Sequence, residues 1–120
     1  MNDFYCDEII SKKTKVDIVY ETEEILAFHH TKPYFELHIV IIPKKHIDSL
    51  STFDNNPALS IEFLKAISYV TKLVESEYGG CRVSSNVGNY QSTKHLHWYV
   101  HRGKRLRNED GSLISKISKI

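Results

Sequence analysis

Cysteine is scarce in this 120-residue sequence, which contains only Cys6 and Cys81. The two lie far apart and neither belongs to a closely spaced pair, so we expect free thiols in a reducing compartment rather than a disulfide framework.

Long apolar runs are also missing. No segment approaches the roughly 20 apolar residues that span a bilayer, and the acidic N-terminus lacks the apolar stretch of a signal peptide. We therefore expect a cytoplasmic protein without a membrane partner.

An excess of charge of either sign is absent too. The 16 lysines and arginines stand against 15 aspartates and glutamates, which leaves a formal net charge of +1. Binding to an extended nucleic acid relies on clustered excess basic residues, so this balance argues against such a partner and still allows a small anionic ligand. With 41% hydrophobic and 26% charged residues, the composition is that of a globular domain.

Hydrophobic periodicity predicts an α+β fold with one long helix. Apolar residues recur at helical spacing between Pro57 and Tyr78, where Pro57 suits the first helical position and Gly79-Gly80 suits the end. Runs typical of β-strands, the first of them a hairpin, lie at 17–28, 37–42, 81–85 and 94–101. The run 37–42 is apolar throughout apart from His38, so we expect it at the centre of an antiparallel sheet of about five strands.

Both ends of the chain allow less definite predictions. Asp3 can cap a short N-terminal helix from Phe4 to about Ser11, with Phe4, Ile9 and Ile10 available for a buried stripe. We expect one domain over residues 1–106. The tail, 107–120, contains Leu113, Ile114, Ile117 and Ile120 at spacings compatible with a helical turn or an interface, and its structure stays open.

The run from His95 to His101 concentrates the chemistry of the sequence. If it is a strand, His95, His97, Tyr99 and His101 share one face, because alternate side chains point the same way. Such a face can place donors, acceptors and a nucleophilic nitrogen beside an anion. For any one of these histidines taken alone, a simpler interpretation is that it lies on a solvent-exposed strand and binds no ligand. A metal site is a weaker alternative, because His101 would lie about 13 Å from His97.

The loop before these histidines favours a phosphate ligand. Asn86, Gln91 and Ser92 supply amide and hydroxyl groups a few residues upstream, and such groups hold phosphate oxygens. Ordinary turn chemistry would account for each of them taken alone.

The same residues resemble the histidine-triad superfamily of nucleotide hydrolases and transferases, whose strand motif is His-φ-His-φ-His-φ-φ, with φ apolar. The corresponding run here is His95-Leu-His97-Trp-Tyr99-Val-His101. The likeness extends to Ile25–His30, to His38–His46 with its Ile-Pro-Lys-Lys-His ending, to the long helix and to the Gln91-Ser92 pair, all in the family's order. The Ile-Pro-Lys-Lys-His ending and the spacing from Gln-Ser to His-x-His are the more specific parts.

The resemblance implies nucleophilic catalysis at phosphorus. By position, His97 would attack the α-phosphate of a nucleotide and form a nucleotidyl-histidine that water then hydrolyses. We expect a backbone group to fix its tautomer. The other roles that the resemblance implies are Ser92 on the leaving group or a phosphate oxygen, Gln91 and Asn86 on phosphate or ribose, His95 beside the nucleophile, and Phe28 with Ile9 at the base. It also implies a homodimer and a small-molecule nucleotide partner.

Three departures from the family pattern qualify this expectation. Tyr99 stands at the third triad histidine and is a neutral donor with an ordinary pKa of about 10, so transition-state stabilisation should weaken while ligand binding survives. His30 stands where many relatives have an aspartate that grips the ribose hydroxyls. Some bacterial relatives hold structural zinc with Cys-x-x-Cys and histidines, whereas Asp3-Phe-Tyr-Cys6 keeps only the second cysteine.

From the last departure we expect no metal and no cofactor, with Cys6 acting as a small hydrophobic residue and with His38 and His46 structural. The leading hypothesis is a hydrolase of nucleoside phosphoramidates or related nucleotidyl compounds, with activity reduced or altered by Tyr99. The alternative is a nucleotide-binding or regulatory module without efficient catalysis.

Overall fold

The computed structural model describes residues 3–114 and shows an antiparallel sheet with one long helix. The strands are β1 (Ile18–Glu21), β2 (Ile25–His29), β3 (Phe35–Pro43), β4 (Arg82–Ser85) and β5 (Trp98–Arg105). The helices are α1 (Pro57–Tyr78) and the short η1 (Tyr5–Ile10), η2 (Leu50–Asn55) and η3 (Gly88–Tyr90). The spatial order of the strands is β1-β2-β3-β5-β4, with every pair antiparallel. The predicted α+β class with five strands and a long helix is confirmed.

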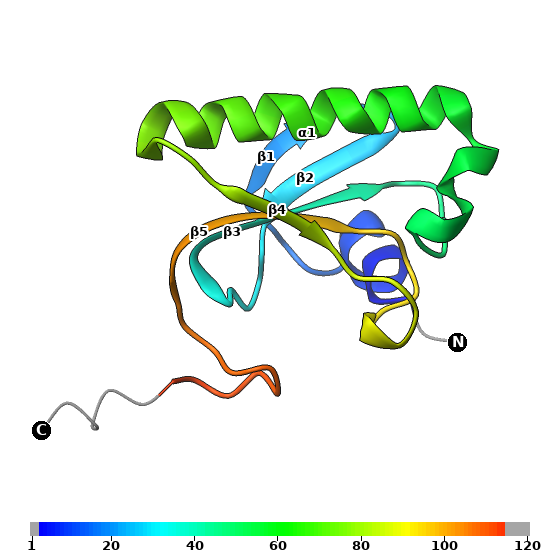
Figure 1. Ribbon diagram of the computed structural model, residues 1–120. Coiled ribbons are helices and arrows are strands. Elements are labelled where there is room, and N and C mark those ends of the chain that lie inside the picture. The colour runs from blue at the N-terminus through cyan, green and yellow to red at the C-terminus, as the bar shows by residue number, and fades with distance from the viewer. Residues whose placement is uncertain (1–2, 115–120) are drawn as a thin grey trace, which may run out of the picture.

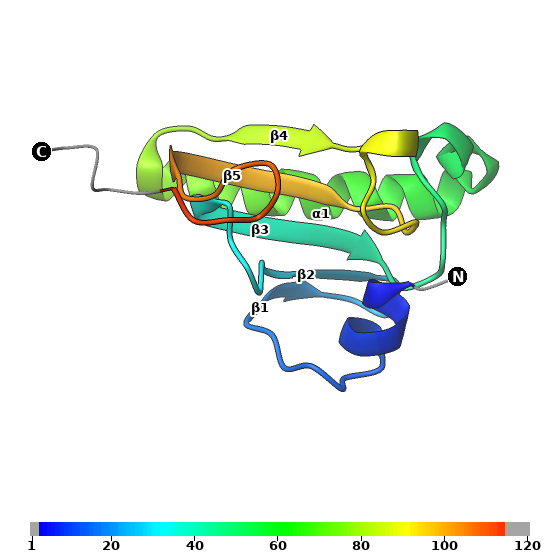
Figure 2. The ribbon, with the colours of Figure 1, turned by 90° about the horizontal axis from the view of Figure 1, so that it is seen from below.

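Strand β3 lies at the centre of the sheet because both of its faces are covered. Helix α1 packs over one face and η1 lies on the other, as Figures 1 and 2 show. Ile39 and Ile41 contribute to the core under α1, whereas Val40 and Ile42 join a second apolar cluster on the side of η1. A strand buried on both faces has a nearly continuous apolar sequence, which is why residues 37–42 lack polar alternation.

Helix α1 spans the predicted residues, Pro57–Tyr78. Pro57 occupies the first turn, where its missing N–H costs no hydrogen bond, and Gly79 ends the helix with a φ of 88°. One stripe of the helix is buried against the sheet, and it consists of Leu59, Phe63, Ala66, Val70 and Val74. Part of the opposite face, including Ile61, Leu64 and Tyr69, remains exposed. No helix among the described residues is long and apolar enough to cross a membrane.

The N-terminal helix η1 is present, and its buried stripe differs from the predicted one. Tyr5 and Ile9 are buried, whereas Phe4 is exposed. The prediction paired Phe4 with Ile9 and Ile10, whereas the buried residues Tyr5 and Ile9 are four apart. It is wrong at Phe4 because the ring of Tyr5 is the one that packs against Phe28 and His97.

The last strand begins and ends later than predicted. Residues 94–97 precede β5, which runs on to Arg105. Leu96 instead donates its N–H to the carbonyl oxygen of Ile47, at 2.6 Å. Beyond β5 the chain turns back, with a bridge between Arg107 and Leu113. Ile117 and Ile120 lie outside the described residues, and the boundary at residue 106 stays a prediction.

Candidate active site

His97 lies just before β5 and is held in one tautomer by the backbone. Its Nδ1 lies 2.8 Å from the carbonyl oxygen of His95, which can only accept, so Nδ1 must donate. The Nε2 atom of the neutral ring therefore carries the free lone pair. The ring is buried, and burial lowers the pKa of His97 despite the hydrogen bond to His95. The imidazole is thus neutral and nucleophilic near pH 7.

Ser85 fixes the backbone of this residue from the neighbouring strand. Its hydroxyl donates to the carbonyl oxygen of His97 at 2.7 Å. The sequence reasoning did not single out Ser85, because a serine at the end of a strand has no distinctive spacing.

Two tyrosine rings lie next to His97. The centroids of Tyr99 and Tyr5 are 5.1 and 5.2 Å from the His97 ring. Burial raises the pKa of Tyr99, so the hydroxyl remains a neutral donor and brings no positive charge. Burial also raises the pKa of Tyr5, and the neighbouring Tyr99 adds to this effect. Tyr5 was not predicted as a site residue, since the predicted stripe of η1 passed through Phe4.

The loop between β4 and β5 is organised by Gln91. Its Nε2 donates to the carbonyl oxygens of Asp48 and Thr93, at 2.8 and 3.3 Å, and its Oε1 accepts the N–H of Gly88 at 3.2 Å. Both ends of the amide therefore bind the protein's own backbone. Among the predicted phosphate contacts, Ser92 is exposed and Asn86 is half-buried. This arrangement gives Gln91 a positioning role and leaves the Ser92 hydroxyl accessible from solvent.

The residues predicted at the base, Phe28 and Ile9, are brought together in the apolar cluster beneath η1. Each has an exposed fraction of 2% or less, and Tyr5 packs in the same cluster. Their assignment to a base pocket stays a prediction. In the structure they form part of the core on the face of the sheet that carries His97.

His30 and His38 form a second imidazole pair further along this face. Their ring centroids are 4.5 Å apart. The N–H of Lys32 donates to Nδ1 of His30, and the N–H of Tyr34 donates to Nδ1 of His38, each at 2.9 Å. Both neutral rings therefore carry their proton on Nε2. Burial lowers the pKa of His30 to about 4 and that of His38 to about 3. At the ribose position proposed for His30, the protein thus offers a neutral donor instead of a carboxylate.

We expect the stability of the protein to fall on mild acidification because His38 is buried and neutral. Its folded pKa of about 3 lies below the ordinary value of about 6.5, so the unfolded chain binds the extra proton. Stability is therefore complete above pH 6.5 and is lost progressively below it. Between pH 6.5 and 5 the free energy of unfolding should drop by about 2 kcal/mol from this residue. Urea titrations at both pH values measure it, and His38→Leu should flatten the dependence. An unchanged pH slope in His38→Leu would contradict this assignment.

His101 does not join the other histidines of the motif. It is buried and stacked on Phe35, with 4.0 Å between ring centroids. His95 lies instead beside Asp3, so the alternative of a metal site made from His95, His97 and His101 finds no support in the geometry.

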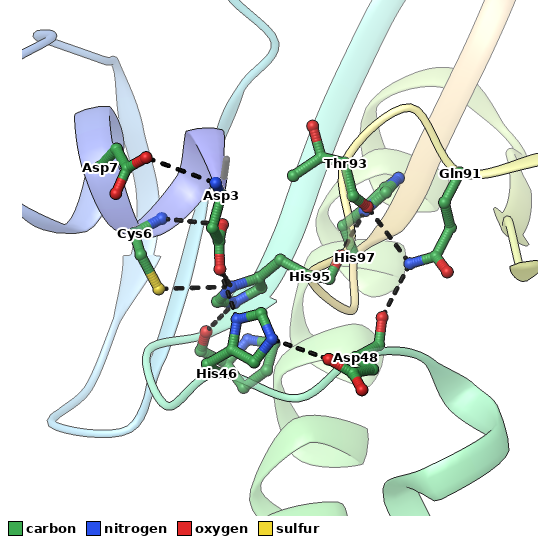
Figure 3. A network of polar contacts seen from close by, with 10 residues as sticks. Asp3, Cys6, Asp7, His46, Asp48, Gln91, Thr93, His95 and His97 are labelled. Atoms are coloured by element: carbon green, nitrogen blue, oxygen red, sulfur yellow. Dashed lines mark hydrogen bonds and ion pairs between the residues drawn. The ribbon is translucent and has the colours of Figure 1, made fainter. Parts of the chain in front are cut away.

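Four potential metal ligands meet where η1 approaches the segment before β5 (Figure 3). Asp3, Cys6, His46 and His95 each offer one ligand atom, and these atoms all lie within 4.8 Å of one another. Carboxylate, thiolate and imidazole are ligands that zinc accepts in tetrahedral sites. The donor set therefore fits zinc. Asp3 and His46 were not predicted as ligands, because the family pattern of two cysteines is incomplete in this sequence. Cys6, predicted to be a small hydrophobic residue, has its Sγ atom 3.6 Å from Nδ1 of His95.

The antiparallel sheet and the buried, tautomer-fixed His97 define a small α+β domain suited to nucleophilic chemistry by histidine. A family model described as "HIT domain" matches residues 11–105. The chain therefore belongs to the HIT domain family.

Relatives and solved structures agree with this membership. The chain is 36% identical over 105 residues to a 14 kDa zinc-binding protein of Zea mays, covering 83% of this chain and 81% of the relative. It is 32% identical over 105 residues to the adenylylsulfatase HINT1 of Arabidopsis thaliana, covering 83% and 71%. The structure of a HIT family hydrolase from Clostridium thermocellum superposes with a TM-score of 0.72 at 29% identity, covering 86% and 91%.

Proposed function

We propose that this protein is a nucleotide hydrolase acting at the α-phosphate of a nucleoside phosphoramidate or a related nucleotidyl substrate, with His97 as the nucleophile. The observation that carries the proposal is the hydrogen bond from His97 Nδ1 to the His95 carbonyl oxygen, which leaves Nε2 free and unprotonated. The similarity to an adenylylsulfatase and to a HIT family hydrolase supports the substrate class.

The reaction proceeds by two displacements at phosphorus. Nε2 of His97 forms a bond to the α-phosphorus while the bond to the leaving group breaks, and the leaving group departs with the electron pair and takes up a proton. The hydroxyl of Ser92, an exposed residue, donates a hydrogen bond to that group or to a phosphate oxygen. Water then attacks the phosphorus and the bond to Nε2 breaks. This step releases the nucleoside monophosphate and regenerates the neutral imidazole of His97.

The residues around the nucleophile set the orientation of the imidazole. The carbonyl oxygen of His95 and the hydroxyl of Ser85 hold His97, and the phenol of Tyr99 offers a neutral hydrogen bond to a phosphate oxygen. If zinc is bound, Asp3, Cys6, His46 and His95 would hold it, and it would supply a structural cross-link rather than a group that touches the substrate.

Hydrolysis of adenosine phosphoramidate and of adenylyl sulfate tests the proposal directly. Both carry an α-phosphate with a different leaving group, so release of adenosine monophosphate from each can be followed by chromatography. We expect turnover of at least one substrate by the wild-type protein. Binding of both substrates without turnover of either would reject the hydrolase.

The second candidate is a nucleotide-binding or regulatory module without efficient catalysis, and Tyr99 at the third triad position favours it. The neutral phenol supports ligand binding and contributes no positive charge to a transition state. Calorimetry with nucleoside monophosphates, beside the turnover assay, separates the two candidates. Tight binding without turnover supports the module, and robust turnover excludes it.

We also propose that two copies pair through the outer face of α1 and the edge strand β4. Ile61 and Leu64 on α1 are 58% and 63% exposed, and β4 forms one edge of the sheet. Pairing would cover these apolar side chains and the free backbone groups of the edge. Light scattering should give twice the chain mass, and Leu64→Lys should shift it toward one chain mass. A monomeric mass for the wild-type protein would contradict the homodimer.

A further inference from the structure

The cluster of Asp3, Cys6, His46 and His95 joins three separate parts of the chain. Asp3 and Cys6 belong to the N-terminal segment around η1, His46 follows β3, and His95 precedes β5. The ligand atoms already lie within 4.8 Å of one another. The Sγ atom of Cys6 is 3.6 Å from Nδ1 of His95. Neighbouring ligands of a tetrahedral zinc ion stand about 3.3 to 3.8 Å apart for ordinary bond lengths, so this pair has the required separation.

The carboxylate of Asp3 is the hub of the cluster. Its Oδ2 lies 2.8 Å from Nδ1 of His95 and 2.5 Å from Nδ1 of His46, while its Oδ1 accepts the N–H of Cys6 at 3.0 Å. The two contacts to imidazole are shorter than a tetrahedral edge. The carboxylate would have to withdraw by about 1 Å or less for an ion to enter between it and the rings. Asp3 therefore points at the same atoms that a metal would bind.

Both imidazoles already use their other nitrogen on an acceptor. Nε2 of His95 lies 2.8 Å from the carbonyl oxygen of Pro43, and Nε2 of His46 lies 2.8 Å from Oδ1 of Asp48. Each Nε2 must carry a proton to make these contacts, so the lone pair of a neutral ring lies on Nδ1, where an ion between the ring and Asp3 would take the place of the proton that now joins Nδ1 to the carboxylate. A metal-bound histidine commonly donates its second nitrogen to a carbonyl or carboxylate in this way. The outer partners of the site are thus in place.

Charge also balances around a divalent cation. The thiolate of Cys6 and the carboxylate of Asp3 contribute two negative charges, and the two neutral imidazoles contribute none. A bound divalent ion therefore gives a neutral set of four ligands, and binding releases the thiol proton to solvent. Sulfur and nitrogen ligands favour zinc over magnesium or calcium, which prefer oxygen.

We propose that Asp3 is a metal ligand, so that Asp3, Cys6, His46 and His95 form a mixed carboxylate-thiolate-imidazole zinc site in which a carboxylate stands in place of a second thiolate. The site ties η1 to the segment that carries the nucleophile, since the carbonyl oxygen of ligand His95 accepts the hydrogen bond that fixes His97. Its occupant would be a structural ion, because all four positions are filled by protein side chains.

Metal binding by the full chain, measured without any activity assay, tests the proposal. The protein is stripped with a chelator under reducing conditions and titrated with Zn²⁺ by calorimetry and with Co²⁺ by absorbance. We expect one equivalent of either ion. The Co²⁺ complex should show the visible bands of tetrahedral cobalt and one thiolate charge-transfer band in the near ultraviolet. Failure of the stripped wild-type protein to bind an equivalent of either ion would overturn the proposal.

Paired variants identify the ligands. Cys6→Ser should abolish the charge-transfer band, whereas the matched control Cys81→Ser should keep it. Asp3→Asn, which retains the shape of the side chain, should weaken Zn²⁺ binding at least about tenfold. Asp7→Asn, in η1, removes a nearby charge and keeps an oxygen that can accept the N–H of Asp3, so it should bind as the wild type does. Equal affinity in Asp3→Asn and the wild-type protein would remove Asp3 from the site.

Asp3→Cys should strengthen the thiolate charge-transfer band of the Co²⁺ complex instead of removing it. It supplies a second thiolate at the same position, so the Co²⁺ complex should show roughly twice the charge-transfer absorbance per bound ion and a higher affinity for Zn²⁺. An unchanged spectrum in a variant that still binds one equivalent would show that residue 3 does not contact the ion. Circular dichroism of each stripped variant verifies that the sheet is retained.

Discussion

Replacing His97 with alanine should lower the rate of hydrolysis of adenosine phosphoramidate by about a thousandfold or more. In the proposed mechanism Nε2 of His97 is the atom that bonds to phosphorus, and its lone pair is available because Nδ1 donates to the His95 carbonyl oxygen. Without the ring no covalent intermediate forms, and water would have to displace the leaving group in one step. Steady-state release of adenosine monophosphate measures the effect.

Two further variants serve as controls, one for the loss of a histidine elsewhere and one for the loss of stability. His29→Ala removes an exposed imidazole at the end of β2 and should leave the rate within about twofold of wild type. His97→Gln fills much of the buried space that alanine leaves empty, so it should be equally inactive while unfolding at nearly the wild-type temperature. Equal rates of adenosine monophosphate release by His97→Ala and by the wild-type protein would remove His97 from the mechanism.

Replacing Tyr99 with histidine should raise the turnover rate by about 10- to 100-fold. The Tyr99 ring lies 5.1 Å from that of His97, and burial raises the pKa of its hydroxyl, so the phenol remains neutral while negative charge builds up on the phosphate oxygens. An imidazole at this position can take up a proton beside the anionic phosphate of a bound substrate, and it then supplies a hydrogen bond together with a positive charge. The increase should appear in kcat more than in KM, because the added interaction strengthens in the transition state.

Tyr99→Phe is the matched control for this prediction. It keeps the ring and removes the hydroxyl, so we expect a further loss of about tenfold in kcat if the phenol donates to the phosphate. Identical rates for the tyrosine, phenylalanine and histidine proteins would show that position 99 lies outside the transition-state contacts.

Local patterns were sufficient to predict the scaffold. The helix at Pro57–Tyr78 is specified by its own first proline, by a buried stripe at helical spacing and by Gly79 in the left-handed region. The central strand is specified by its nearly continuous apolar run, which both covered faces require. These features depend on neighbours in the sequence, so they can be recognised without the fold.

The details of the site depend on contacts between distant residues, and these were missed. The segment 94–97 has a strand-like sequence, yet Leu96 bonds to the carbonyl oxygen of Ile47 instead of continuing β5. Tyr5 packs against His97, and this contact joins residues that lie 92 positions apart in the sequence. The backbone partner of His97 was expected, because a nucleophilic imidazole needs one fixed tautomer.

The cluster around Asp3 illustrates the same limit. Two of its members, His46 and His95, lie 43 and 92 residues from Asp3 in the sequence. The sequence shows the loss of a second cysteine and cannot show that a carboxylate comes within hydrogen-bond distance of both rings. An expectation based on residue type alone therefore overlooked a donor set that only the fold assembles.

The stereochemical course at phosphorus tests the central role of His97 most directly. A nucleoside phosphoramidothioate of one configuration is hydrolysed by the wild-type protein in water enriched in heavy oxygen, and the configuration of the thiophosphate product is determined. Attack by His97 followed by attack by water inverts the phosphorus twice, so retention is predicted. Inversion would mean that water displaces the leaving group directly, and it would contradict a nucleotidyl-His97 intermediate.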